Sequence, residues 1–209
     1  MKILLVNSSA HQEGCTYTAL MEIAHTLEEC GAEWEMVQLG GGPLRDCIGC
    51  GGCAKKGDGL CVFSDDVVND LIRKAQEADG FVFGTPVYYA HPSGRLLSAL
   101  DRAFYAGGSA FAHKPGFAVA SARRAGTTAS LDVILKHLTI NQMPVVSSTY
   151  WPMVHGNTPA EVLQDKEGLQ TMRNAARNLV WLVSCIQAGK QAGISAPQAE
   201  RGSRTNFIR

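Results

Sequence analysis

The chain has 209 residues, with 19 basic and 19 acidic side chains and no formal net charge at pH 7. This neutral balance excludes the electrostatic signature of a protein that binds nucleic acid or an anionic membrane surface. Apolar residues make up 45% of the chain and charged residues 18%, which excludes a disordered chain and favours one globular domain.

Apolar patterning predicts alternating strands and helices along the chain. Short continuous apolar runs are typical of strands buried on both faces, and apolar residues three or four apart indicate helices. In chain order, the patterns predict a strand over residues 3–6, a helix over 16–30, a strand over 33–39, a helix over 66–78, a strand over 80–86, a helix over 93–105, a strand over 115–121, a helix over 127–141, a strand over 144–148 and a helix over 166–188.

Five strands that alternate with five helices predict an α/β fold, in which a parallel sheet is covered by helices on both faces. We expect one domain over residues 1–190, with a cysteine-rich insertion at 43–64 and a C-terminal arm at 191–209. The apolar opening is too short for a signal peptide, and no run approaches the length of a membrane-spanning helix. The cytoplasm is therefore the expected location.

The loop at residues 8–18 follows the first predicted strand and leads into a helix. It is rich in hydroxyl groups and has no Lys or Arg, so a phosphate there would be held by hydroxyls and by the free N–H groups of the helix N-terminus. The alternative is ordinary capping of the helix by Ser or Thr. The glycine-rich fingerprints of dinucleotide-binding folds and P-loops are absent from the sequence.

Two further loops follow the third and fourth predicted strands. Tyr88 and Tyr89 stand in a Pro-bounded turn and could form an aromatic wall for a planar heterocycle, or one Tyr could pack in the core. Residues 121–128 combine hydroxyls, cations and Gly126, which could bond the edge of a ring, or form a solvated turn that caps the next helix. In open α/β sheets, ligands bind at such strand ends.

Residues 8–16 and 84–89 together resemble the loops of the NADPH-dependent FMN reductase and flavodoxin-like family. The resemblance implies a three-layer, doubly wound flavodoxin-like fold with a five-stranded parallel sheet in the order 2-1-3-4-5. Ser8, Ala10, His11 and Cys15 depart from the usual residues of the family's phosphate loop. The resemblance implies that FMN is bound by Ser9, His11, Cys15, Thr16, Tyr17, Thr18, Thr85, Pro86, Val87, Tyr88, Tyr89, Ser121, Arg124 and Gly126.

Four cysteines, Cys47, Cys50, Cys53 and Cys61, have the spacing C-x2-C-x2-C-x7-C in a glycine-rich loop. Close thiolates on such a loop can hold an iron–sulfur cluster, because Gly lets the backbone turn around it. The spacing resembles that of iron–sulfur flavoproteins, which implies a 4Fe–4S cluster near FMN. A loop without a cluster, a zinc site and disulfides remain alternatives.

The resemblance implies an FMN-dependent oxidoreductase that passes electrons through FMN and the cluster. The alternatives are a cluster-free NAD(P)H-dependent FMN or quinone reductase and a flavodoxin-like electron carrier. NAD(P)H is the expected diffusible donor, beside small-molecule or protein electron partners, and no residue is predicted to act as a catalytic acid or nucleophile. The family also implies a homodimer or homotetramer, with Trp151, His155 and residues 205–209 as candidate contacts.

The remaining cysteines and histidines carry less information. Cys30 and Cys185 fall on predicted helices and are expected to be small core residues. No partner is evident for His25, His113 or His137, so surface or packing roles are expected for them.

Overall fold

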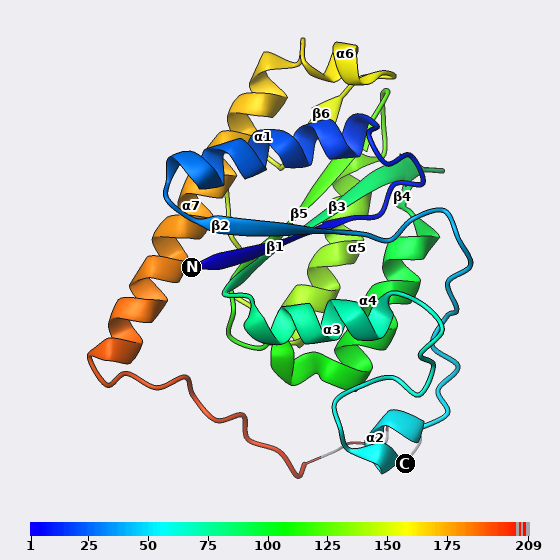
Figure 1. Cartoon of the computed structure of the whole chain (residues 1–209), viewed down its shortest axis with the longest axis vertical. Helices are drawn as coiled ribbons and strands as arrows, with labels where there is room; N and C mark the ends of the chain where they lie inside the picture. Colours follow the sequence, from blue (N-terminus) through cyan, green and yellow to red (C-terminus); the bar gives the residue numbers. More distant parts are fainter. Residues whose placement is uncertain (204, 206, 208–209) are drawn as a thin grey trace.

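A computed structural model describes residues 1–203, 205 and 207. Its centre is a twisted sheet with the strand order β2-β1-β3-β5-β6 (Figure 1). These strands run parallel, and they cover β1 (Lys2–Asn7), β2 (Glu33–Gln38), β3 (Gly80–Tyr88), β5 (Gly116–Ala122) and β6 (Met153–His155). Numbered among themselves, they have the predicted order 2-1-3-4-5, which confirms the flavodoxin-like topology. A two-residue strand, β4 (His91–Pro92), turns back antiparallel to the end of β3.

Helices cover both faces of the sheet, as predicted (Figure 1). On one face, Ile3 and Leu5 of β1 belong to the same buried cluster as residues of α1 (Cys15–Glu29) and α7 (Lys166–Gln191). On the other face, Leu4 and Val6 pack in a cluster with α3 (Val68–Glu77), α4 (Gly94–Gly107) and α5 (Thr127–Ile140). All four β1 side chains are fully buried, which explains the unbroken apolar run, since burying each one contributes roughly 1.5–3 kcal/mol.

The predicted strand at residues 144–148 is wrong. Gly116 donates to the Pro144 carbonyl and accepts from the Val146 amide, but no further bonds of this kind continue the ladder. The chain then leaves the sheet and returns at Pro152, whose carbonyl accepts from the Ala120 amide, so that β6 begins at Met153. The apolar run at 144–148 reflects the burial of Val146 rather than strand pairing.

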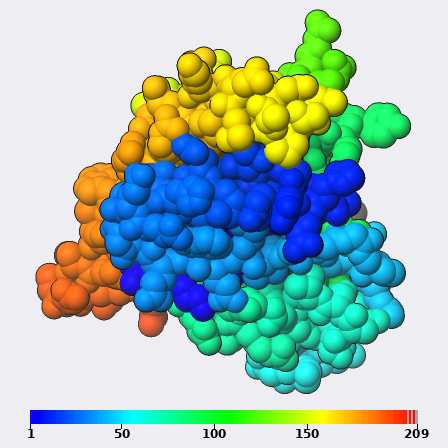
Figure 2. Space-filling view, turned by 45° about the horizontal axis from the view of Figure 1, so that its top comes forward, coloured from blue at the N-terminus to red at the C-terminus, as the bar shows by residue number. Residues whose placement is uncertain are grey.

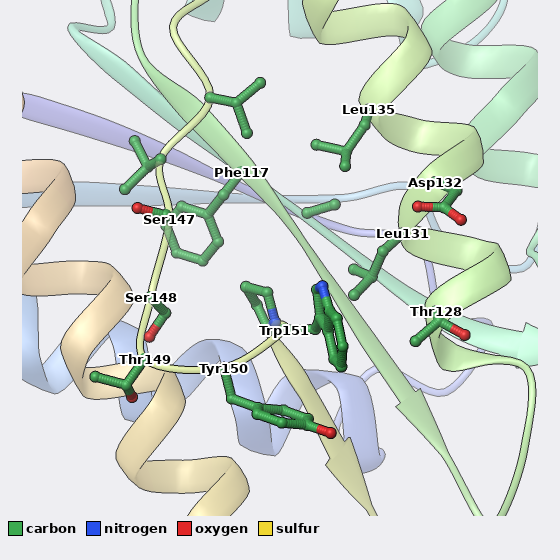
Figure 3. A pocket seen from close by; sticks show the side chains of 14 residues that line it. Phe117, Thr128, Leu131, Asp132, Leu135, Ser147, Ser148, Thr149, Tyr150 and Trp151 are labelled. Carbon is green, nitrogen blue, oxygen red and sulfur yellow. The ribbon is translucent and has the colours of Figure 1, made fainter.

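The detour of residues 147–151 leaves a pocket between this segment and α5. Figure 3 shows Phe117 and Leu131 around this pocket, with Trp151 at its side. Trp151 and Tyr150 stack edge to face, with ring centroids 4.7 Å apart, and both are more than half exposed.

Several short elements escaped sequence analysis because they hold less than two helical turns. These are α2 (Gly52–Lys56) inside the cysteine-rich segment, a 3-10 turn at Gly108–Ala110, and α6 (Pro159–Val162) after β6. After α7 the described residues are exposed and have no regular structure, and the boundary of the arm at residue 190 stays a prediction. Residues 204, 206, 208 and 209 of the predicted arm lie outside the described residues.

Three minor predictions are also wrong. Cys30, the C-cap residue of α1, and Cys185, within α7, are exposed rather than buried. His137 has a partner, since its Nε2 lies 2.8 Å from a carboxylate oxygen of Asp101 on the neighbouring helix α4.

In the described part of the chain, no helix is long and apolar enough to cross a membrane.

Candidate active site

A pocket lies at the carboxyl ends of β1, β3, β5 and β6. It gathers residues from all three predicted loops, because the ends of parallel strands meet at one edge of the sheet. The predicted residues that line it are Ser9, His11, Cys15, Thr16, Pro86, Val87, Tyr88 and Ser121. Figure 2 shows the surface of α1 beside the segment that follows β6, which forms another wall of this pocket.

The loop after β1 leaves the N-terminus of α1 uncapped by side chains. Gly14 is the N-cap residue and makes no side-chain hydrogen bond to the helix. The Ser9 hydroxyl instead accepts from the His11 amide at 3.1 Å, and the Ser9 amide donates to the Asn7 side chain at 3.1 Å. The ordinary capping alternative therefore does not describe this loop, and the first-turn N–H groups are suited to a bound anion.

One hydrogen bond joins the α1 side of the pocket to β5. The hydroxyls of Thr16 and Ser121 lie 2.8 Å apart, and both side chains are buried. This hydrogen bond links the first loop directly to the third loop.

Other predicted residues shape the loops without lining the pocket. Thr85 is fully buried, and its hydroxyl donates to the Pro86 carbonyl and accepts from the Ser93 amide, each at 2.9 Å. Thr18 donates to the Gly14 carbonyl at 3.2 Å. Tyr17 lines a separate shallow pocket with Trp34 and Met36.

Tyr89, Arg124 and Gly126 also lie outside the pocket lining. Tyr89 is fully exposed, with a left-handed backbone at φ 50°. Arg124 is exposed, and its neighbour Arg123 lines the pocket instead. Gly126 has φ 95°, and a Cβ at this position would come within 2.4 Å of the Ala90 Cα. Only glycine therefore allows the turn after β5 to pack against the turn after β3.

Sequence analysis missed part of the lining, above all the segment after β6. Had β6 been placed correctly, the rule that ligands bind at strand carboxyl ends would have found this segment. The additional lining residues are Gln12, Glu13, Gly14, Ala122, Arg123, Gly156, Asn157, Thr158 and Pro159.

Cys15 connects the segment after β6 to α1. Its thiol donates to the Gly156 carbonyl, with the sulfur 3.6 Å from the oxygen. Burial raises the pKa of the Cys15 thiol, a backbone hydrogen bond opposes part of this rise, and the nearby Glu161 carboxylate adds a smaller increase. A protonated thiol is the form that can donate this hydrogen bond.

The cysteine-rich segment forms a second candidate site. Cys47, Cys50, Cys53 and Cys61 all line one small cavity. Gly49 and Gly51 between them have positive φ angles of 63° and 66°, which lets the loop curl. Within residues 1–203, 205 and 207, no three His, Cys, Asp or Glu side chains lie close enough together to hold one metal ion. The four thiols around one cavity nevertheless supply the donor set that a cluster requires.

Cys61 is the most constrained of the four cysteines. It is buried, whereas Cys47 and Cys50 are exposed. Its sulfur accepts a hydrogen bond from Arg102 Nε at 3.3 Å, and its backbone is held by the Asn69 side chain.

The fold and the strand-end pocket define a flavodoxin-like α/β protein. A family profile described as NADPH-dependent FMN reductase matches residues 1–158, and the chain belongs to this family of FMN-dependent oxidoreductases. The predicted resemblance is thereby confirmed.

Two relatives agree with this assignment, and a solved structure shares the fold. An iron–sulfur flavoprotein of Methanocaldococcus jannaschii is 32% identical over 90% of this chain and its own full length. An iron–sulfur flavoprotein of Archaeoglobus fulgidus is 31% identical over 83% of this chain and 86% of its own. The structure of RosB with bound 8-demethyl-8-formylriboflavin-5'-phosphate superposes with a TM-score of 0.69 at 16% identity, covering 100% of this chain and 92% of RosB.

Proposed function

We propose that the strand-end pocket binds FMN and that the protein passes electrons through this flavin. The observation that carries the proposal is the meeting of three loops around one pocket, beside a helix N-terminus that no side chain caps. When bound, FMN supplies the hydride and one-electron chemistry, and the protein supplies binding and orientation.

Each loop has a separate part in the proposal. We propose that Ser9, Thr16 and the α1 amides hold the phosphate without help from a Lys or Arg in the loop. Pro86, Val87 and Tyr88 border the flavin ring, and Arg123 is the cation of the third loop that lines the pocket. Arg124, which sequence analysis favoured for that part, is exposed outside the lining.

Titration of the flavin-free protein with FMN tests this proposal. Flavin fluorescence should be quenched on binding at one equivalent per chain, and riboflavin, which lacks the phosphate, should bind much more weakly. Equal affinity for riboflavin and FMN would contradict the proposed phosphate site, and no binding of either would contradict the flavin site altogether.

We propose further that the cysteine site holds a 4Fe–4S cluster through Cys47, Cys50, Cys53 and Cys61. The shared cavity supports this, as do the two relatives named as iron–sulfur flavoproteins. Anaerobic reconstitution should give four iron and four sulfide per chain, as the cluster type requires. Protein that binds zinc instead of iron, or that takes up no iron, would contradict the proposal. So would full retention of iron in every variant that lacks one of the four cysteines.

A second candidate is a cluster-free NAD(P)H-dependent FMN or quinone reductase. The observation on the side of this alternative is that no three metal-ligating side chains among the described residues lie close enough together to hold one metal ion. Steady oxidation of NADPH with a quinone by iron-free protein would support it. Fast reduction by a ferredoxin without any NAD(P)H oxidation would instead support an electron carrier.

We propose a homodimer or homotetramer, located in the cytoplasm, where reduced thiols persist. Trp151 and Tyr150 are 57% and 53% exposed, and an aromatic pair of this size on a surface is typical of protein interfaces. His155 is only partly exposed at the end of β6. Light scattering tests the assembly, and a monomeric mass would contradict it.

A further inference from the structure

We propose that Arg102 is a positioning residue of the cysteine site, which supports the Cys61 sulfur and raises the reduction potential of the cluster bound there. This inference rests on the proposed cluster. Its physical basis is a buried positive charge directed at one of the four sulfur ligands.

Arg102 lies on α4, remote in sequence from the cysteine segment, and only 1% of it is exposed. Its Nε donates to the Cys61 sulfur at 3.3 Å. The two terminal nitrogens donate to the carbonyls of Arg45 and Phe63, at 3.3 Å and 3.2 Å, and one of them also pairs with the Asp66 carboxylate. The guanidinium thus contacts both ends of the cysteine segment, and the buried Asp66 carboxylate balances its charge.

Asn69 on α3 holds the backbone of the same cysteine. Its side-chain oxygen accepts from the Cys61 amide at 2.8 Å, and its side-chain nitrogen donates to the Cys61 carbonyl at 2.9 Å. Cys61 is therefore positioned before any cluster is present. The other three cysteines lie on or beside the glycine-rich turn, where Gly49 and Gly51 allow the backbone to adjust.

The potential of an iron–sulfur cluster depends on hydrogen bonds to its sulfurs, on burial and on nearby charge. One-electron reduction adds one negative charge, which the buried Arg102 guanidinium stabilises and the Asp66 carboxylate opposes. Because the pair is buried, neither effect is screened as it would be at the surface. Loss of Arg102 and loss of Asp66 should therefore shift the potential in opposite directions, which a merely structural role would not predict.

The test is a redox titration of the anaerobically reconstituted protein with dithionite as the electron donor, followed by electron paramagnetic resonance. Arg102→Gln should lower the equilibrium constant for cluster reduction at least tenfold, a downward shift of about 59 mV for one electron. Arg102→Lys retains the charge and should shift the potential less. Asp66→Asn should shift the potential upward.

Arg95→Gln is the matched control, because Arg95 also lies on α4 and donates to a backbone carbonyl near the cysteine segment, at Gly42, but does not reach a sulfur. Its potential should equal that of the wild type. Should Arg102→Gln fail to fold, Asp66→Asn and Arg102→Lys decide the question by the sign of their shifts.

The outcomes separate this inference from the proposed cluster. A wild-type protein that takes up no iron and sulfide overturns the cluster and, with it, this role of Arg102. A wild-type cluster with equal potentials in all variants, or shifts of the same sign in Arg102→Gln and Asp66→Asn, overturns the role of Arg102 alone.

Discussion

Thr16 on α1 and Ser121 on β5 are 105 residues apart in the sequence, and their hydroxyls form a buried 2.8 Å hydrogen bond at the wall of the strand-end pocket. The bond joins the proposed phosphate loop to the third loop. It therefore links the stability of the fold to the shape of the pocket.

Replacing Thr16 with Val should weaken FMN binding about tenfold and destabilise the protein by about 1 kcal/mol, since it removes one buried hydrogen bond and leaves the Ser121 hydroxyl unpaired. Calorimetric titration and urea unfolding measure the two effects. Thr26→Val is the matched control, because Thr26 is a buried residue of the same helix whose hydroxyl donates to the Glu22 carbonyl within that helix. An equal loss of FMN affinity in both variants would contradict the prediction.

Gly126→Ala should destabilise the protein by about 2 kcal/mol or more and weaken FMN binding. The added Cβ meets Ala90 at 2.4 Å, and the φ of 95° is unfavourable for alanine. Gly40→Ala is the control, since Gly40 also has a positive φ of 71° but nothing lies within 4 Å of the added carbon. Thermal unfolding separates the two, and a Gly126→Ala variant no less stable than Gly40→Ala would show that the two turns can move apart.

The Asp66–Arg102 pair should make stability depend on acid. Burial raises the pKa of Asp66, but hydrogen bonds from Arg102 and the Val68 amide outweigh it, and the net pKa is lowered. A carboxylate with a lowered folded-state pKa stabilises the protein above its unfolded pKa, near 4, and loses this effect as the pH falls through the folded value.

Asp66→Asn should therefore cost about 3 kcal/mol at pH 7, because it leaves the Arg102 charge buried without a partner. The difference from the wild type should shrink as the pH falls below 4. Urea unfolding of both proteins from pH 7 to pH 3 measures this. A difference that stays constant with pH would show that the carboxylate charge is not the cause.

Cys15 should react with iodoacetamide more slowly than the exposed Cys30 at pH 8. The raised pKa of the Cys15 thiol leaves less thiolate, which is the reactive form, and the Gly156 carbonyl holds its proton. Peptide mass spectrometry after timed alkylation gives both rates in one sample. Added FMN should slow Cys15 further and leave Cys30 unchanged, and equal rates for the two thiols would refute the prediction.

Local sequence patterns determined the main elements of the fold and most loops of the candidate site. The apolar run at residues 3–6, the helical spacing of α1 and α7 and the strand–helix alternation predicted a parallel sheet covered by helices on both faces, because burial on both faces dictates those periodicities. The loops after β1, β3 and β5 and the four cysteines were also found from the sequence, because strand ends and ligand spacings are visible along the chain.

Only the tertiary structure decided the rest, because these features depend on contacts between residues far apart in sequence. The strand pattern at Val145 and Val146 is as strong as that at Met153, and only pairing with Ala120 selects the latter. Likewise, nothing local to Arg102 indicates that it meets Cys61, 41 positions away, or that Cys15 contacts Gly156, 141 positions away. Periodicity reports which side of an element is buried, whereas packing determines which distant group it meets there.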